Sequence, residues 1–292
     1  MSIFRGSCVA LVTPFAKTGV DFGKLKELIN WHIENETDSI LVCGTTGEAT
    51  TMSLEERKNV IKFTVKEVNG RVPVIAGTGS NDTKASIDMS LFAEDTGVDG
   101  LLVITPYYNK TSPKGLIAHF KAINDSVKTP IILYNVPSRT NMNISPSALL
   151  TLSKLSNIVA IKEASGDFSQ IAEMAALCPN IDIYSGNDDQ IVPLLSLGGT
   201  GVISVFANIA PKQAHDICKL FFDGKIKESR DMQLKYLDLI NKLFIETNPI
   251  PVKTALNLMN FKCGDLRLPL CEMEDSNLLQ LKEALKLQNL LK

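Results

Sequence analysis

The hydrophobic pattern of this chain repeats one unit, a short apolar and β-branched run followed by a stretch with helical periodicity. The runs are nearly continuous in apolar residues, which is typical of strands covered on both faces. Eight such runs occur, at Ser7–Phe15, Ser39–Thr46, Val72–Gly79, Gly100–Tyr108, Pro130–Pro137, Ile158–Ala164, Ile181–Gly186 and Thr200–Asn208. Right-handed crossovers make such strands parallel, and the number eight predicts an α/β fold, a closed (β/α)8 TIM barrel.

Local signals mark where the helices begin. Ser53 and Glu56 have the spacing of a capping box, and four prolines stand where a first helical turn needs no N–H, at Pro113, Pro146, Pro211 and Pro251. The alternative fold is a doubly wound open sheet. Its dinucleotide signature is incomplete, because Gly77–Asp82 lacks the third glycine of G-x-G-x-x-G.

Residues 224–292 carry no strand signal. Helices are predicted at Lys225–Phe244, Val252–Phe261 and Ser276–Leu290, each with a leucine-rich face. In the last one we expect a single apolar stripe, formed by leucines 278, 279, 281, 285 and 290. We therefore expect a barrel over residues 1–223 and a C-terminal α-helical extension over residues 224–292.

Charge and composition restrict the partners. Thirty basic and 32 acidic side chains give a net charge of −2, with no block of five like charges, so neither nucleic acid nor a membrane surface is an expected partner. The first residues lack an apolar segment of signal-peptide length, and no run approaches the length of a membrane span. We expect a soluble cytoplasmic protein whose partners are small molecules or copies of itself.

The cysteines and histidines give no metal signal. The six cysteines are scattered without a C-x-x-C pair, which argues against a zinc knuckle or a disulfide framework. His32, His119 and His215 fall in separate predicted helices, away from strand ends. Each is interpreted as structural, so no metal site is predicted.

In a barrel of this kind, chemistry is expected from residues at the carboxyl ends of the strands. Lys162 ends the run Ile158–Ala164 and shares a face with the small residue Ala160. A charged ammonium is unfavourable in an apolar wall, so the side chain of this lysine is expected to be an amine that can attack a carbonyl. Two alternatives stay open from position alone, a lysine reaching to solvent and a lysine paired with Glu163.

Other strand ends supply hydroxyls and a guanidinium. Tyr134 and Tyr108 could shuttle protons beside such a lysine, or could simply pack at the rim. Thr45 and Thr46 lie between two glycines and could cradle a substrate carboxylate, although strand-to-helix turns favour these residues anyway. Arg139 is suited to bidentate carboxylate binding, or is an ordinary surface arginine.

With these residues assembled, the chain resembles the dihydrodipicolinate synthases, within the lysine-dependent pyruvate aldolases that include N-acetylneuraminate lyase. The resemblance runs from about Gly6 to the final helix. Gly44-Thr45-Thr46-Gly47-Glu48 is similar to the family's carboxylate-binding turn, and Val159–Ala164 is similar to its Schiff-base strand. The segment Tyr134–Thr140 is more discriminating, because sugar-acid lyases generally lack its arginine.

The resemblance implies a role for each candidate. Lys162 would form an imine with pyruvate, and Tyr134 would donate and accept protons in a hydroxyl relay with Thr45 and Tyr108. Thr46 would hold the pyruvate carboxylate, and Arg139 would bind L-aspartate 4-semialdehyde. The main chain around Gly186 and Ile203 would line the pyruvate pocket.

The resemblance also implies an assembly and a chemistry. Tyr108 would act in the neighbouring subunit's site, within a dimer of dimers. No metal or organic cofactor is implied, because the lysine imine carries the reaction.

One departure concerns feedback by lysine. Inhibited members of the family carry two histidines and a glutamate where this chain has Leu54, Arg57 and Ala85, although Asn81 and Tyr107 match. We therefore expect weak or absent inhibition by lysine. Two alternatives to the synthase are another pyruvate aldolase, such as a sugar-acid or N-acetylneuraminate lyase, and a ligand-binding barrel without catalysis.

Overall fold

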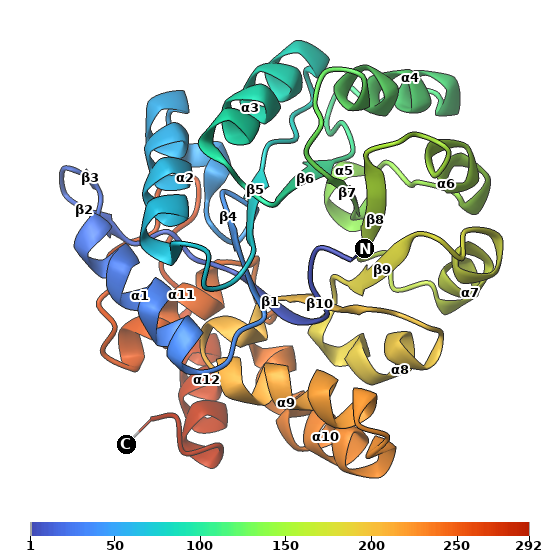
Figure 1. Cartoon of the computed structure of the whole chain (residues 1–292). Helices are drawn as coiled ribbons and strands as arrows, with labels where there is room; N and C mark the ends of the chain where they lie inside the picture. Colours follow the sequence, from blue (N-terminus) through green and yellow to red (C-terminus); the bar gives the residue numbers. More distant parts are fainter. Residues whose placement is uncertain (1, 292) are drawn as a thin grey trace.

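The computed structural model describes residues 2–291 and contains a closed barrel of eight parallel strands (Figure 1). In barrel order the strands are β1 (Gly6–Ala10), β4 (Ser39–Val42), β5 (Val74–Gly77), β6 (Gly100–Ile104), β7 (Ile131–Asn135), β8 (Ile158–Glu163), β9 (Asp182–Ser185) and β10 (Gly201–Ser204). Strand β10 pairs with β1 and closes the sheet. The predicted TIM barrel is confirmed, and the open-sheet alternative is wrong.

Helices follow the strands and form a ring around the barrel (Figure 1). They are α1 (Phe22–Glu34), α2 (Leu54–Val68), α3 (Thr83–Thr96), α4 (Pro113–Asn124), α5 (Pro137–Thr140), α6 (Pro146–Leu152), α7 (Phe168–Leu177), α8 (Ile191–Ser196) and α9 (Pro211–Phe222). Short 3-10 turns lie at η1 (Ala49–Thr51), η2 (Asp188–Gln190) and η3 (Phe206–Asn208). The Ser53 capping box is present, and the four prolines lie in first turns, as predicted.

The observed strands are shorter than the predicted runs, because the last residues of several runs leave the sheet. The first run shows the clearest difference. Strand β1 ends at Ala10, and β2 (Phe15–Ala16) pairs instead with β3 (Gly19–Val20) in a small hairpin. Pro14 has no N–H to donate to a ladder, which separates the two segments. The polar ends of the runs therefore become the loops on which candidate site residues lie.

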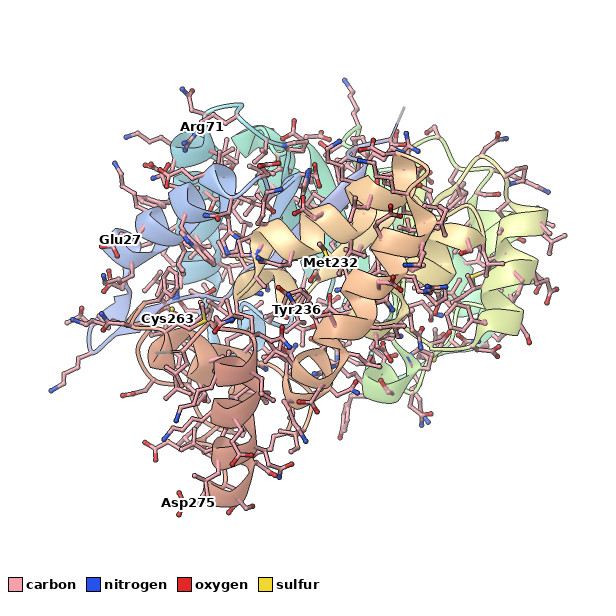
Figure 2. The ribbon with its side chains drawn as sticks, turned by 90° about the horizontal axis from the view of Figure 1, so that it is seen from below. Glu27, Arg71, Met232, Tyr236, Cys263 and Asp275 are labelled. Carbon is pink, nitrogen blue, oxygen red and sulfur yellow. The ribbon has the colours of Figure 1, made fainter. Side chains whose placement is uncertain are left out.

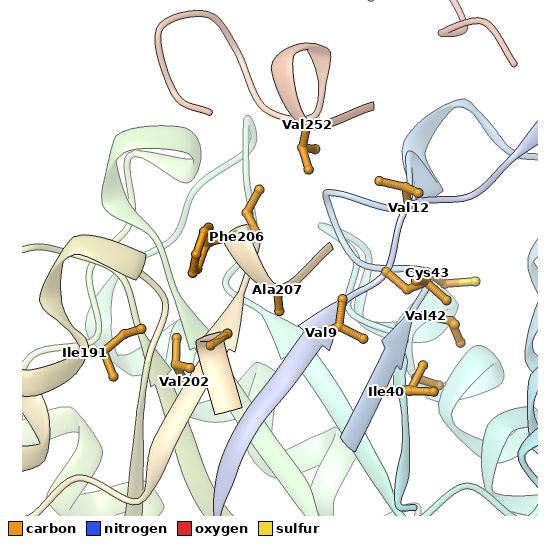
Figure 3. Packing of buried hydrophobic residues seen from close by; sticks show 14 of the residues in the cluster. Val9, Val12, Ile40, Val42, Cys43, Ile191, Val202, Phe206, Ala207 and Val252 are labelled. Carbon is orange, nitrogen blue, oxygen red and sulfur yellow. The ribbon is translucent and has the colours of Figure 1, made fainter. Parts of the chain in front are cut away.

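Alternation along the strands divides the core into two layers. One set of side chains fills the barrel interior, and includes Leu41, Ala160 and Ile203. The other set packs between the strands and the helices, as Val9, Ile40 and Val202 do in Figure 3.

The C-terminal extension consists of α10 (Ile226–Lys242), α11 (Ile250–Leu258) and α12 (Asp275–Leu287), and begins after the turn between α9 and α10. Tyr236 of α10 (Figure 2) packs against Phe206 of the barrel, with ring centroids 5.4 Å apart. Met1 and Lys292, the outer limits of the two predicted parts, lie outside the described residues.

One prediction for the last helix is wrong. Leu281 and Leu285 are buried, but Leu279 is 61% exposed, because a residue two positions from Leu281 lies on the opposite side of a helix. Leu290 lies beyond the end of α12. Within residues 2–291, no helix combines the length and apolar character that crossing a membrane requires.

Candidate active site

A cavity of about 170 Å³ opens at the carboxyl ends of the barrel strands. Six of the predicted site residues line it: Thr45, Thr46, Tyr134, Arg139, Lys162 and Gly186. They come from loops and strand ends that are far apart in sequence. The barrel topology therefore brings together most of the candidates, with Tyr108 and Ile203 as the exceptions.

Lys162 lies on the inner face of β8, and its side chain enters the cavity. The register places it beside Tyr134 of β7 and Tyr184 of β9, and only 5% of its surface is exposed. Its Nζ lies 4.4 Å from the centroid of the Tyr134 ring. Among residues 2–291 this amine has no hydrogen bond or ion pair, so it is available to react with a ligand in the cavity.

The alternative in which Lys162 pairs with Glu163 does not occur. Successive residues of a strand point to opposite faces. The Glu163 carboxylate accepts hydrogen bonds from Asn135 Nδ2 at 2.9 Å and from the Ser165 backbone N–H at 2.6 Å. Burial raises the pKa of Glu163. This carboxylate therefore stabilises the ends of β7 and β8 from outside the cavity.

Gly186 makes room for the lysine stem. A Cβ at this position would lie 3.1 Å from Lys162 Cε and 2.6 Å from Ala164 Cβ, which is too close for any larger residue without rearrangement. Ile203 is fully buried in the barrel interior and does not reach the cavity, whose lining on that side is Val205. Gly186 therefore acts directly on the shape of the site, whereas the Ile203 side chain supports it from below.

The turn after β4 presents Thr45 and Thr46 to the cavity. Thr46 is almost fully buried, and its Oγ1 accepts a hydrogen bond from Asn248 Nδ2 at 3.0 Å. Glu48 of the same turn forms a buried ion pair with Lys253 of α11, at 2.7 Å between Oε1 and Nζ. The C-terminal extension therefore holds this turn in place.

Arg139 lies on the short helix α5 at the rim. Its Nη2 donates to the backbone oxygen of Asn248 at 3.0 Å, so the guanidinium is partly tied to the C-terminal extension. A planar guanidinium in this position can still offer further N–H groups to a carboxylate in the cavity.

Tyr108 does not lie in the cavity of its own chain. It is 92% exposed and has a left-handed backbone, with φ of 69°. Its neighbour Tyr107 lines a second cavity of about 260 Å³, together with Arg57. The predicted relay through Tyr108 is therefore incomplete within one chain.

Comparisons with known proteins identify the family. The model of the dihydrodipicolinate synthetase family matches residues 3–288. The chain belongs to this family. It is 67% identical to the 4-hydroxy-tetrahydrodipicolinate synthase of Clostridium perfringens (strain SM101 / Type A), over 99% of this chain and 100% of that protein. The predicted synthase activity, that of a class I aldolase lyase, is confirmed.

Solved structures agree with this assignment. The chain is similar to dihydrodipicolinate synthase from Aquifex aeolicus, with 43% identity, a TM-score of 0.97, and coverage of 98% of this chain and 99% of that one. It is also similar to a structure described as the first monomeric dihydrodipicolinate synthase variant. Here the identity is 40%, the TM-score is 0.97, and coverage is 99% of this chain and 98% of that one.

Sequence reasoning missed several cavity residues of this family member, above all Asn248, with Ser138, Asn187, Val205 and Phe244. Asn248 and Phe244 come from the extension, which carried no catalytic motif. The Asn248-Pro249 pair is at most a turn signal in the sequence and does not indicate a site.

The sequence analysis also did not anticipate a cluster of side chains of the types that can ligate metals. Glu36, His215 and Asp216 hold ligand atoms within 4.8 Å of one another among residues 2–291. The ammonium of Lys212 contacts both carboxylates. The group lies by the amino end of β4, where His215 also contacts Asp38, so it is separate from the cavity around Lys162.

Proposed function

We propose that the chain condenses pyruvate with L-aspartate 4-semialdehyde through an imine on Lys162. The observation that carries this proposal is the Lys162 amine, which has no partner among residues 2–291 and enters the cavity beside Tyr134, with 4.4 Å between Nζ and the ring centroid. A desolvated lysine is the group that forms Schiff bases with carbonyl substrates.

The reaction follows from moving charge onto and off this imine. The amine adds to C2 of pyruvate and water leaves, giving a protonated imine that withdraws electrons. Tyr134 then removes a C3 proton, and the resulting enamine attacks the aldehyde carbon of the semialdehyde while the aldehyde oxygen takes up a proton. The amine of the second substrate attacks C2, releases Lys162 and closes the ring.

The other candidates would bind and orient the two substrates. Thr46 would hold the pyruvate carboxylate and Thr45 would extend the proton relay from Tyr134. Gly186 and the main chain near Ile203 would shape the pyruvate pocket. Arg139 would bind the carboxylate of the semialdehyde at the rim. The scheme requires no metal or organic cofactor.

Trapping the imine tests the proposal. The protein is incubated with pyruvate, reduced with borohydride, digested and weighed. We expect a pyruvate adduct on Lys162, and turnover with L-aspartate 4-semialdehyde but not with N-acetylmannosamine. An unmodified Lys162 would refute the imine, whereas turnover of N-acetylmannosamine would favour a sugar-acid lyase.

A second variant tests the role of Arg139. Arg139→Ala should weaken use of the semialdehyde far more than it weakens formation of the pyruvate adduct. An equal loss of both would assign Arg139 to pyruvate binding or to the structure of the rim.

We propose further that the protein is a homo-oligomer, a dimer of dimers, in which Tyr108 completes the relay of a neighbouring subunit. The 92% exposure of this tyrosine and its strained backbone support a partner-facing role. One similar structure is described as the first monomeric dihydrodipicolinate synthase variant, so the assembly of this chain is tested directly.

Mixing subunits tests this assignment. Lys162→Ala and Tyr108→Phe are each expected to be impaired as pure proteins. In a mixed dimer, the Tyr108→Phe subunit keeps its lysine and receives an intact tyrosine from its partner, so activity should return. If Tyr108 acts within its own chain, mixing restores nothing.

Two further proposals concern regulation and location. With Leu54, Arg57 and Ala85 in place of groups that could bind an ammonium, millimolar lysine should leave the rate almost unchanged, and strong inhibition would contradict this.

A cytoplasmic location is proposed from the six cysteines, which are all free.

A further inference from the structure

Asn248 contacts the two residues that would bind the two substrate carboxylates. It lies between α10 and α11, is only 6% exposed, and lines the cavity of Lys162. Its side-chain Nδ2 donates to Thr46 Oγ1 at 3.0 Å. Its backbone oxygen accepts from Arg139 Nη2 at 3.0 Å. One residue of the extension therefore connects the turn after β4 with helix α5.

The contact between Asn248 and Thr46 determines which hydrogen bonds the Thr46 hydroxyl can still form. A threonine hydroxyl has one proton and two lone pairs. Because the carboxamide N–H occupies a lone pair, the Thr46 proton remains free, and within residues 2–291 it has no acceptor. A carboxylate in the cavity supplies that acceptor.

The carboxamide itself is held on one side only. Asn248 Oδ1 is buried and has no hydrogen-bond partner among the described residues. A buried unpaired acceptor is unfavourable for folding and is uncommon in native proteins. The arrangement is therefore better explained by orientation of Thr46 than by a stabilising network.

We propose that Asn248 is a positioning residue, whose side chain directs the Thr46 hydroxyl toward the pyruvate carboxylate and whose backbone oxygen holds Arg139 for the semialdehyde. This inference rests on the proposed function. The two contacts use different atoms, so a side-chain substitution separates them. Changing the carboxamide affects Thr46 and leaves the backbone contact with Arg139 in place.

Asn248→Asp is the sharpest substitution, because a carboxylate can only accept. The new carboxylate would accept a hydrogen bond from the Thr46 hydroxyl, so that this hydroxyl no longer donates to pyruvate. It would also add a negative charge beside the bound carboxylate. Because pyruvate loses a hydrogen bond to its charged carboxylate, its KM should rise on the order of tenfold or more. We expect a much smaller change in the KM for the semialdehyde, measured at saturating pyruvate. The pyruvate concentration that half-saturates the borohydride-trapped adduct should rise in parallel.

Asn187→Asp is the matched control. It places the same charge in the same cavity, but Asn187 Nδ2 contacts Gln190 and not Thr46. A general effect of charge would raise the KM for pyruvate equally in both variants. The proposal requires the larger increase in Asn248→Asp.

A double-mutant cycle with Thr46→Val tests the direction of the bond. Without the Thr46 hydroxyl there is no proton to direct, so Asn248→Asp should add little to the loss caused by Thr46→Val. Independent, multiplicative losses would overturn the proposal. So would an unchanged KM for pyruvate in Asn248→Asp, because the carboxamide oxygen would then be the atom that faces Thr46.

The test is separate from that of the function itself. If the unmodified protein forms no pyruvate adduct, the proposed function fails. If the adduct forms and only the predicted difference between the two KM values is absent, the role of Asn248 alone fails.

Discussion

Two tyrosines flank Lys162 on neighbouring strands, and their hydroxyls have opposite surroundings. Tyr184 of β9 is fully buried, stacks on Phe4 with centroids 4.3 Å apart, and donates to the Phe4 backbone oxygen at 2.7 Å. Tyr134 of β7 lines the cavity, and among residues 2–291 its hydroxyl has no partner. Both residues align with Lys162 in the sheet register.

The two hydroxyls lie at different ends of the barrel, that of Tyr184 at the amino end beside Phe4 and that of Tyr134 at the carboxyl end. At the amino end, the Tyr184 hydroxyl and the Asp38 carboxylate are both paired within the protein, and Asp38 accepts from both the Ser7 N–H and His215. At the carboxyl end, the Lys162 amine and Asn248 Oδ1 have no partner within the described residues. The paired Tyr184 and Asp38 stabilise the fold, whereas the Lys162 amine and Asn248 Oδ1 can form hydrogen bonds or react with a ligand in the cavity. The same residue type can therefore serve stability at one end and chemistry at the other.

Of the substitutions that test this comparison, Tyr134→Phe should have the largest effect, and the effect should be on kcat. Removing a general acid and base should lower kcat by roughly 10²- to 10⁴-fold. Because the hydroxyl makes no contact within the described protein, the melting temperature should stay within error of the unmodified protein. Steady-state rates and calorimetry measure the two quantities. A large loss of stability with little loss of kcat would reverse the assignment.

Tyr184→Phe should show the opposite pattern. The substitution keeps the stacked ring but leaves the buried Phe4 oxygen unpaired, which costs about 1–3 kcal/mol of unfolding free energy. Burial raises the pKa of the Tyr184 phenol, so this group stays a donor and does not shuttle protons. Denaturant unfolding should reveal the loss while kcat remains close to normal. A collapse of kcat in the folded variant would show that this end of the barrel also takes part in catalysis.

What the sequence could predict depended on local pattern. The apolar runs were sufficient for the barrel, and alternation along β8 placed Lys162 on the inner face with Ala160. Asn248 was beyond reach, because its contact with Thr46 joins positions 202 residues apart. The buried pair of Lys253 with Glu48 was hidden for the same reason, at a separation of 205 residues.

The smallest expected effect concerns pH at the amino end. The hydrogen bond with Asp38 raises the pKa of His215, and burial opposes this to a lesser degree. Glu36 and Asp216 add negative charge on the other side of the ring, where Lys212 pairs with both. A raised pKa in the folded state gives stability that is fully present below the ordinary value of 6.5 and is lost as pH rises through the folded value.

His215→Gln removes this titration while keeping a polar side chain. The melting temperature of the unmodified protein should fall more than that of the variant between about pH 5.5 and pH 8.5, because only the unmodified protein has a His215 that binds its proton more tightly when folded than when unfolded. The pH profile of kcat should be the same in both, since His215 lies at the end of the barrel away from Lys162. Equal pH dependence of melting would mean that His215 stays neutral in the fold. A shifted kcat profile would instead show that His215 influences the site around Lys162, and the assignment of His215 to stability alone would then be wrong.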